Sequence, residues 1–255
     1  MDGKKIGIII VVFTVVIFLV ACIVTFKGKN LLAVEAGAQQ EVGQKIELEV
    51  NSEKSDIRLP VWEPSGQYVD LDKLILVNKQ NPVGKDFIPK DLVRPAYRAQ
   101  NRNPDDQYLT REAADALDKL ACDALGEGHE IVVTTAYRSY NLQNYLYNNY
   151  VKKDGKELAD KYSAQPGKSE HQTGLAVDVS SPSVNYKLVK EYGNTTEGKW
   201  LAENSWKYGF IIRYLEGQED VTGYTYEPWH LRYVGQEAAT VIKDKGITLE
   251  EYLNK

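Results

Sequence analysis

The 255-residue sequence predicts an α+β fold with an antiparallel sheet, preceded by one N-terminal transmembrane helix. Segments typical of strands and of helices do not alternate strictly along the chain, which argues against a doubly wound parallel sheet. Residues 6–26 carry no charge, and as a helix they would span about 31 Å, close to the thickness of a bilayer core. We therefore divide the chain into a membrane segment (1–27), an extracytoplasmic linker (28–68) and a folded domain (69–255).

The apolar segment 6–26 has two interpretations. It reads IGIIIVVFTVVIFLVACIVTF, and LVAC within it resembles a lipoprotein cleavage site with Cys22 as the lipidated residue. The apolar run continues beyond Cys22 instead of turning polar, which favours an uncleaved signal-anchor. Both interpretations place the domain outside the cell, on the cell membrane, with a single membrane attachment.

The linker is predicted from composition. Residues 28–68 are rich in Ala, Gln, Glu, Gly and Ser, and they end in PVWEPSG, with two prolines and a glycine. Only the alternating run KIELEV (45–50) indicates a short strand there. The chain has a net charge of −5 and no cluster of Lys and Arg in the domain, which argues against a nucleic-acid partner.

The first segments of the domain are predicted to include both a strand and a helix. LILVNKQNPV (74–83) predicts a short apolar strand that ends in an Asn-Pro turn. Apolar residues recur at helical spacing over 110–126, with Thr110 as a candidate N-cap and Gly126 as a stop. The same patterns predict strands at 130–137, 175–179, 210–214 and 230–234, and helices at 139–151 (capped by Ser139), 196–209 and 234–253.

The stretch SEHQTGLAVDVSS (169–181) is the first candidate site. His171 lies in a loop, and Asp178 alternates with apolar residues on the strand that follows. A carboxylate on such an apolar strand is costly to bury unless a cation or a metal accompanies it. A turn at Gly174 can bring His171 beside Asp178. A histidine and an aspartate at this spacing are more often a simple hydrogen-bonded pair, so this stretch alone does not establish a metal site.

A second motif, YEPWHLRYVG, supplies a third candidate ligand, His230. Two imidazoles and one carboxylate give zinc three protein ligands and leave a fourth position for water, as in catalytic zinc sites. Glu227 precedes His230 by three residues, and Pro228 disfavours a helix there. We therefore expect an extended turn entering the strand, with the Glu227 carboxylate beside the metal's water. The alternative is that Glu227 is a surface acid.

Arg138 is a candidate for binding an anion. It lies where the predicted strand 130–137 ends and the next helix begins, a rigid position at the rim of a sheet. A planar guanidinium there can hold a carboxylate through two hydrogen bonds or stabilise an oxyanion. The alternative is a surface arginine in an ordinary ion pair.

The two motifs together resemble a known family. S-x-H-x-x-G-x-A-x-D (169–178) followed by E-P-W-H (227–230) is similar to VanY-type D-alanyl-D-alanine carboxypeptidases, which are zinc peptidases of bacterial cell-wall peptides. The resemblance extends over most of 70–250, from LILVNKQNP through KYGFIIRY to TGYTYEPWHLRYVG. It implies a small antiparallel sheet flanked by helices, the Hedgehog/D,D-peptidase-like fold.

The resemblance also implies roles for individual residues. One Zn²⁺ per chain would be bound by His171, Asp178 and His230, with Glu227 as the catalytic base. Arg138 would contact the substrate, and Ser169 and Gln143 would line the site.

The implied activity is removal of the C-terminal D-alanine from peptidoglycan stem peptides. The family name places a D,D-carboxypeptidase acting on pentapeptides first, with an L,D-carboxypeptidase acting on tetrapeptides as the alternative. Two rivals are a zinc-containing domain that binds wall peptides without cutting them and an anchored scaffold with a structural metal. A base at Glu227 argues against a pure binding module. We expect the stem peptides and the membrane, through residues 6–26, as partners, and a monomeric chain.

Overall fold

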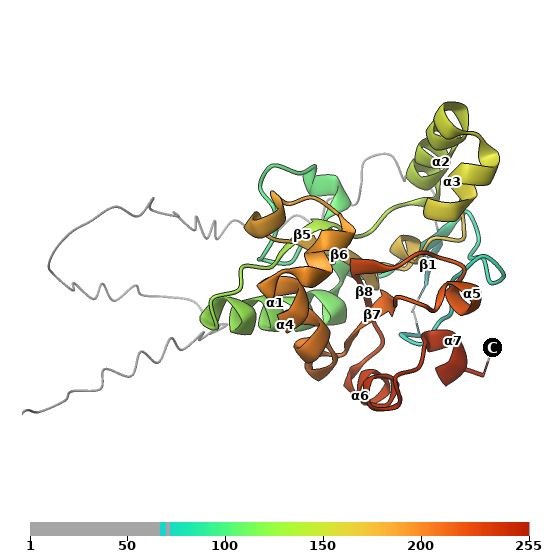
Figure 1. Ribbon diagram of the computed structural model, residues 1–255. Coiled ribbons are helices and arrows are strands. Elements are labelled where there is room, and N and C mark those ends of the chain that lie inside the picture. The colour runs from blue at the N-terminus through green and yellow to red at the C-terminus, as the bar shows by residue number, and fades with distance from the viewer. Residues whose placement is uncertain (1–66, 70–71, 255) are drawn as a thin grey trace, which may run out of the picture. The chain divides into compact units, whose positions relative to one another are not determined.

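The computed structural model describes residues 67–69 and 72–254 (Figure 1). The predicted membrane segment, nearly all of the predicted linker and the predicted strand 45–50 lie outside the described residues. Within the described ranges, no helix has the length and apolar character needed to cross a membrane. The first described strand begins at Gln67, just upstream of the predicted start of the domain.

The described chain contains eight strands and seven α-helices, connected by short 3₁₀ helices. The strands are β1 (Gln67–Val69), β2 (Phe87–Pro89), β3 (Leu92–Val93), β4 (Leu109–Thr110), β5 (Val132–Thr135), β6 (Ala176–Ser180), β7 (Phe210–Tyr214) and β8 (Glu227–Tyr233). The helices are α1 (Arg111–Gly126), α2 (Tyr140–Asp154), α3 (Lys156–Tyr162), α4 (Thr196–Asn204), α5 (Glu219–Thr222), α6 (Gln236–Lys245) and α7 (Leu249–Tyr252).

The central sheet has four strands in the order β5-β6-β8-β7, and every neighbouring pair is antiparallel. A two-stranded antiparallel sheet, β3-β4, and a two-stranded parallel sheet, β1-β2, are separate from it. The prediction of an α+β fold with a small antiparallel sheet flanked by helices is confirmed for the described residues. The parallel pairing of β1 with β2 was not predicted.

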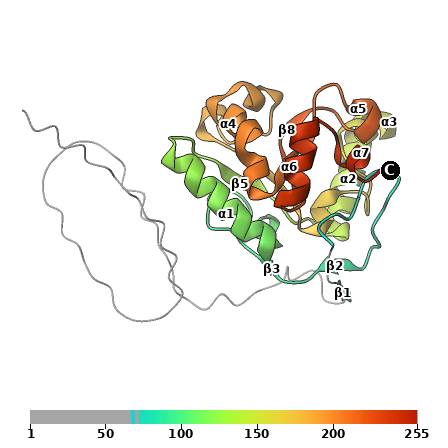
Figure 2. The same cartoon turned by 90° about the horizontal axis from the view of Figure 1, so that it is seen from below.

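The main core lies between one face of this sheet and helices α1 and α4, which lie close together in both views (Figure 1 and Figure 2). Leu175, Val177 and Val179, which belong to the alternating apolar stretch around Asp178, are all part of this core. A second cluster packs α6 and α7 against Ile211 of β7, whereas the neighbouring Phe210 packs in the main core. Helices therefore cover both faces at this edge of the sheet.

The predicted strand at 74–83 is wrong, since no strand forms there. The segment is apolar because Leu74 and Leu76 pack on the cluster around α6, and Val77 is fully buried. At the start of this segment, backbone carbonyls bind a side chain instead of a neighbouring strand. Arg232 Nη2 donates to the carbonyl oxygens of Lys73 and Ile75, at 3.0 and 2.6 Å.

The predicted boundaries of α1 and α2 hold to within a few residues, whereas the helix predicted at 196–209 ends at Asn204 and continues as a 3₁₀ helix, and the segment 234–253 forms two helices, α6 and α7. Ser139 caps α2, and its hydroxyl accepts a hydrogen bond from the Leu142 amide at 3.2 Å. Thr110 occupies the N-cap position of α1 but makes no capping hydrogen bond through its side chain. Gly126 is the last residue of α1, as the sequence predicted.

Gly174 joins the 3₁₀ helix η2 (Glu170–Thr173) to the segment leading into β6, and its φ of 67° is left-handed. A Cβ atom there would lie 2.8 Å from Leu92 Cδ2, and Leu92 is buried and cannot easily move. Backbone conformation and close packing therefore both require glycine at this turn.

Gly174→Ala should destabilise the protein more than Gly217→Ala. Gly217 also has a left-handed φ, of 78°, but a Cβ atom there meets no atom within 4 Å. Both substitutions cost about 1 kcal/mol for the backbone conformation, and overpacking against Leu92 adds about 1–3 kcal/mol to Gly174→Ala. Equal losses in urea unfolding of the two variants would show that close packing does not constrain this turn.

Candidate active site

The register of two central strands places two of the predicted ligands opposite each other. Asp178 on β6 pairs directly with His230 on β8. His171 arrives from the neighbouring 3₁₀ helix, whose turn at Gly174 leads into β6. The carbonyl of His171 accepts a hydrogen bond from the Arg138 amide at 3.0 Å, which ties this helix to the end of β5.

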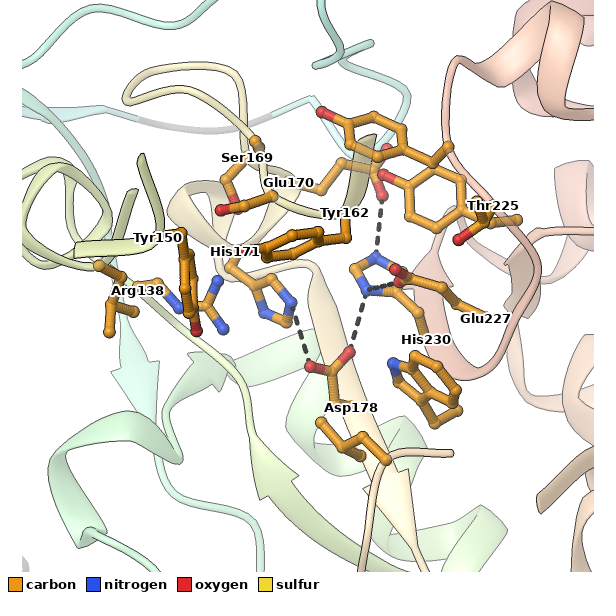
Figure 3. Close-up of a pocket in the computed structure, with 17 residues that line it drawn as sticks. Arg138, Tyr150, Tyr162, Ser169, Glu170, His171, Asp178, Thr225, Glu227 and His230 are labelled. Carbon is orange, nitrogen blue, oxygen red and sulfur yellow. Dashed lines mark hydrogen bonds and ion pairs between the residues drawn. The ribbon is translucent and has the colours of Figure 1, made fainter. Parts of the chain in front are cut away.

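The structure brings His171, Asp178 and His230 together as a buried group (Figure 3). One ligand atom from each lies within 4.8 Å of the others. His171 Nε2 is 3.5 Å from one carboxylate oxygen of Asp178, and His230 Nδ1 is 3.0 Å from the other. In a tetrahedral zinc site with bonds near 2.0 Å, neighbouring ligand atoms are about 3.3 Å apart, so this donor set fits zinc.

The hydrogen bonds of His171 provide a second test of the fit. His171 Nδ1 lies 2.6 Å from the carbonyl oxygen of Ala136. A carbonyl only accepts, so the ring proton is on Nδ1, and the lone pair of Nε2 faces the Asp178 carboxylate. Two acceptors that face each other in a buried site require a cation between them. The orientation of His171 is therefore that of a metal ligand.

The protonation of the three residues follows from burial and from their contacts. Burial lowers the pKa of His171, with partial opposition from Asp178, and so favours the neutral form that binds metals. Burial alone would raise the pKa of Asp178, but His171 and His230 hold it below its usual range. Burial acts to lower the pKa of His230, and hydrogen bonds to Asp178 and Glu170 outweigh it and raise it to about 9.

Glu227 is placed beside this group by an irregularity of β8. Ile212 pairs with Leu231 and Tyr214 pairs with Glu227, so two residues of β7 span four residues of β8. Such a bulge changes the direction in which side chains point. It includes Pro228, which has no amide hydrogen to donate to the ladder.

The bulge brings Glu227 Oε2 to 3.8 Å from His230 Nδ1, with the carboxyl side chain 17% exposed. Burial is the main cause that raises the pKa of Glu227, to about 7. A carboxylate with such a pKa can both accept and return a proton near neutral pH. The prediction of an extended turn entering the strand needs one change, because β8 already begins at Glu227.

Arg138 lies on the opposite side of the metal group from Glu227 in the close-up view (Figure 3). Its Nη1 donates to Gln143 Oε1 at 2.9 Å, and Gln143 Nε2 donates to the carbonyl of Ala164 at 2.6 Å. Ser169 lines the pocket together with Arg138, whereas the buried Gln143 is not among its lining residues. Gln143 therefore lies behind Arg138 and holds its guanidinium in place.

One pocket of about 410 Å³ is lined by the three candidate ligands together with Glu227, Arg138 and Ser169. Its other walls are mainly aromatic: Tyr150 and Tyr162, from helices α2 and α3, contact each other edge to face, with ring centroids 5.3 Å apart. Trp229 of β8 also lines it. An open, partly aromatic pocket around a metal group suits a substrate of peptide size.

Glu170, to which the sequence motifs assign no role, lies next to His230. Glu170 is fully buried, and it accepts hydrogen bonds from Arg213 and Arg232. Burial alone would raise the pKa of Glu170, but these two arginines lower it below its usual range. The strand sequences FIIRY and HLRYV indicate that such an acid exists, because a buried arginine within an apolar strand requires a buried acid as its partner.

Comparisons with known proteins agree with this geometry. Residues 106–236 match the family model of VanY, D-alanyl-D-alanine carboxypeptidase. Over 183 residues, 71% of this chain and 67% of the relative, the sequence is 47% identical to the putative carboxypeptidase YodJ of Bacillus subtilis (strain 168).

Two solved structures are also similar. The LdcB LD-carboxypeptidase matches with a TM-score of 0.69 and 44% identity, over 74% of this chain and 90% of that one. A vancomycin-resistance D,D-pentapeptidase, VanY from a VanB-type cassette, in complex with Zn(II), matches with a TM-score of 0.60 and 34% identity, over 72% and 100%. This chain belongs to the VanY family of D-alanyl-D-alanine carboxypeptidases.

Proposed function

We propose that this member of the VanY family is a zinc-dependent carboxypeptidase that releases the C-terminal D-alanine of peptidoglycan stem peptides. One observation carries the proposal: His171, Asp178 and His230 converge within 4.8 Å, buried, with the Glu227 carboxylate beside them. In support, solved VanY structures contain Zn(II) or D-alanine-D-alanine, the latter at 34% identity and a TM-score of 0.60.

In this proposal the residues around the scissile bond have different roles. Zinc, held by His171, Asp178 and His230, supplies Lewis acidity for water and for the peptide carbonyl. Glu227 takes a proton from the attacking water and delivers it to the leaving amino group. Arg138, held by Gln143, binds the negative charge of the substrate or of the tetrahedral intermediate.

The proposal also specifies which peptide bond is cut, an L,D- or a D,D-bond. The family name placed the D,D-carboxypeptidase first in the sequence analysis. The chain is more similar to the L,D-carboxypeptidase LdcB than to the D,D-pentapeptidase, in both identity and TM-score. We therefore favour an L,D-carboxypeptidase acting on tetrapeptide stems, with the D,D-activity on pentapeptides as the second candidate.

The rival function is a wall-peptide binding module without catalysis. Glu227 argues against it, because a binding module has no need of a buried carboxylate whose pKa is about 7 next to the metal group.

Localisation is a separate proposal that rests on sequence alone. The uncharged segment 6–26 would anchor the chain as a signal-anchor with the catalytic domain outside the cell, and lipidation at Cys22 is the alternative. A peptidoglycan substrate agrees with both. We propose that the chain acts as a monomer, since it supplies the three candidate ligands, Glu227 and Arg138 by itself.

The full-length protein in detergent, loaded with zinc, should release D-alanine from a purified stem peptide. We expect cleavage of the tetrapeptide to exceed that of the pentapeptide, measured by mass spectrometry of both products. Glu227→Gln should keep the zinc and lose about 10²–10⁴-fold in kcat, because the proton acceptor is removed.

Glu203→Gln is the matched control, since Glu203 is an exposed glutamate on α4, outside the pocket. It should cleave at the normal rate. Cleavage of neither peptide by the zinc-loaded protein would leave the binding module as the better function. Normal turnover by Glu227→Gln would remove Glu227 from the mechanism.

Zinc affinity should rise with pH at the alkaline side of neutrality. With a pKa of about 9, His230 is protonated before the metal binds, so ligation at Nδ1 must release that proton. Between pH 7.5 and 8.5 the affinity should therefore increase about tenfold, and it should level off above pH 9. Competition with a chromophoric chelator, corrected for its own protonation, measures this, with His129→Gln as the control variant. An affinity independent of pH over this range would contradict the assignment of His230.

A further inference from the structure

Four buried charged residues form a cluster behind the metal group. Glu170 comes from the 3₁₀ helix before β6, Arg213 from β7, Arg232 from β8 and Glu250 from α7. Two negative and two positive charges balance, which is a requirement for charges removed from water. Elements far apart in the sequence are therefore joined by the ion pairs of this cluster.

Within the cluster, one oxygen of Glu170 receives both arginines. Glu170 Oε1 accepts from Arg213 Nε at 2.8 Å and from Arg232 Nη1 at 2.7 Å. The other two nitrogens of Arg213 donate to both oxygens of Glu250, at 2.8 and 2.6 Å. Glu250 thus binds Arg213 through both of its carboxylate oxygens. It is connected to the metal group through Arg213 and Glu170.

The second oxygen of Glu170 points at a metal ligand. Among the described residues, the only hydrogen-bond partner of Glu170 Oε2 is His230 Nε2, at 3.5 Å. Glu170 bound to two guanidinium groups is a carboxylate, and a carboxylate only accepts. The proton that His230 keeps when a metal binds must then be the one on Nε2, and Nδ1, 3.0 Å from Asp178, is the nitrogen that gives up its proton to the metal.

We propose that Glu170 is a positioning residue, which fixes His230 in the tautomer protonated on Nε2 so that Nδ1 is presented to the metal. Arg213 and Arg232 hold the Glu170 carboxylate at the correct place and orientation by engaging its other oxygen. The inference rests on the proposed function only in requiring a metal at His171, Asp178 and His230.

The chemistry of Glu170→Gln distinguishes this role from a merely structural one. The two guanidinium groups donate, so they will hold the amide oxygen of the glutamine. The amide NH₂ then faces His230 Nε2 and favours the opposite tautomer, with the proton on Nδ1, where the metal should bind. Glu250→Gln removes the same charge from the same cluster but contacts no metal ligand, which makes it the matched control.

Zinc affinity, measured by chelator competition on the full-length protein in detergent, is the first readout. Glu170→Gln should lose about 10–100-fold in affinity, as expected when the partner of a metal-bound histidine is removed. Glu250→Gln should bind zinc close to the wild-type affinity. Equal affinities for the two variants would overturn the proposal, because a structural role would affect both alike.

The tautomer of His230 is the second readout. The chain has three histidines, so long-range ¹H–¹⁵N spectra of histidine-labelled protein can be assigned by single substitutions. Zinc-loaded wild type and Glu250→Gln should show His230 protonated on Nε2 and metal-bound through Nδ1. The opposite tautomer in wild type would overturn the proposal. These measurements need no substrate, so their failure is distinct from a failure of peptide cleavage.

If Glu170→Gln does not fold, Glu170→Asp replaces it. The shorter carboxylate keeps its charge for Arg213 and Arg232 but no longer reaches His230 with its second oxygen. A loss of zinc affinity comparable to that expected for Glu170→Gln supports the positioning role. Wild-type affinity in Glu170→Asp contradicts it.

Discussion

The antiparallel register between β6 and β8 is the constraint on which the site depends. It sets Asp178 opposite His230, and a slip of β6 by one residue would turn Asp178 into the core that contains Val177 and Leu231. The same alternation that buries one face against α1 and α4 therefore directs the polar residues to the other face. Thr134 of β5 ties the other edge of β6 in place, since its hydroxyl donates to the carbonyl of Asp178 at 2.9 Å.

Three carboxylates near this register differ in charge compensation, and the difference assigns their roles. Asp178 faces two histidines, and Glu170 faces two arginines, so the pKa of each lies below its usual range. Glu227 is mostly buried with only partial compensation from His230, and its pKa rises to about 7. Groups whose pKa values are separated in this way carry distinct functions. In the proposed mechanism, Asp178 and Glu170 remain charged, for ligation and for positioning, and Glu227 exchanges protons.

Local sequence patterns were sufficient for most elements of the fold. The apolar alternation at 175–179 predicted both β6 and its buried face, and the helical spacing at 110–126 predicted α1. The strand predicted at 74–83 was wrong because the apolar side chains of this segment are buried in the same way as those of a strand. The carbonyl of Ile75 binds Arg232, 157 residues away along the chain, and no local pattern contains that contact.

The same limit applies to the site. The motifs at 169–178 and 227–230 were sufficient to select the three ligand residues, which the structure brings together. The motifs assigned no role to Glu170, because its contacts are with Arg213 and Arg232, separated from it by 43 and 62 residues. Gln143 was expected in the pocket, and it lies instead behind Arg138, since only the packing of α2 determines where that side chain points.

The central claim is that one metal ion is bound by three residues and leaves Glu227 free. X-ray diffraction from crystals of the zinc-loaded protein, recorded on both sides of the zinc absorption edge, tests it most directly. The account predicts one anomalous peak within about 2.0–2.2 Å of His171 Nε2, an Asp178 oxygen and His230 Nδ1, with the Glu227 carboxylate outside bonding distance. A peak elsewhere, or one with Glu227 as a ligand, would contradict it.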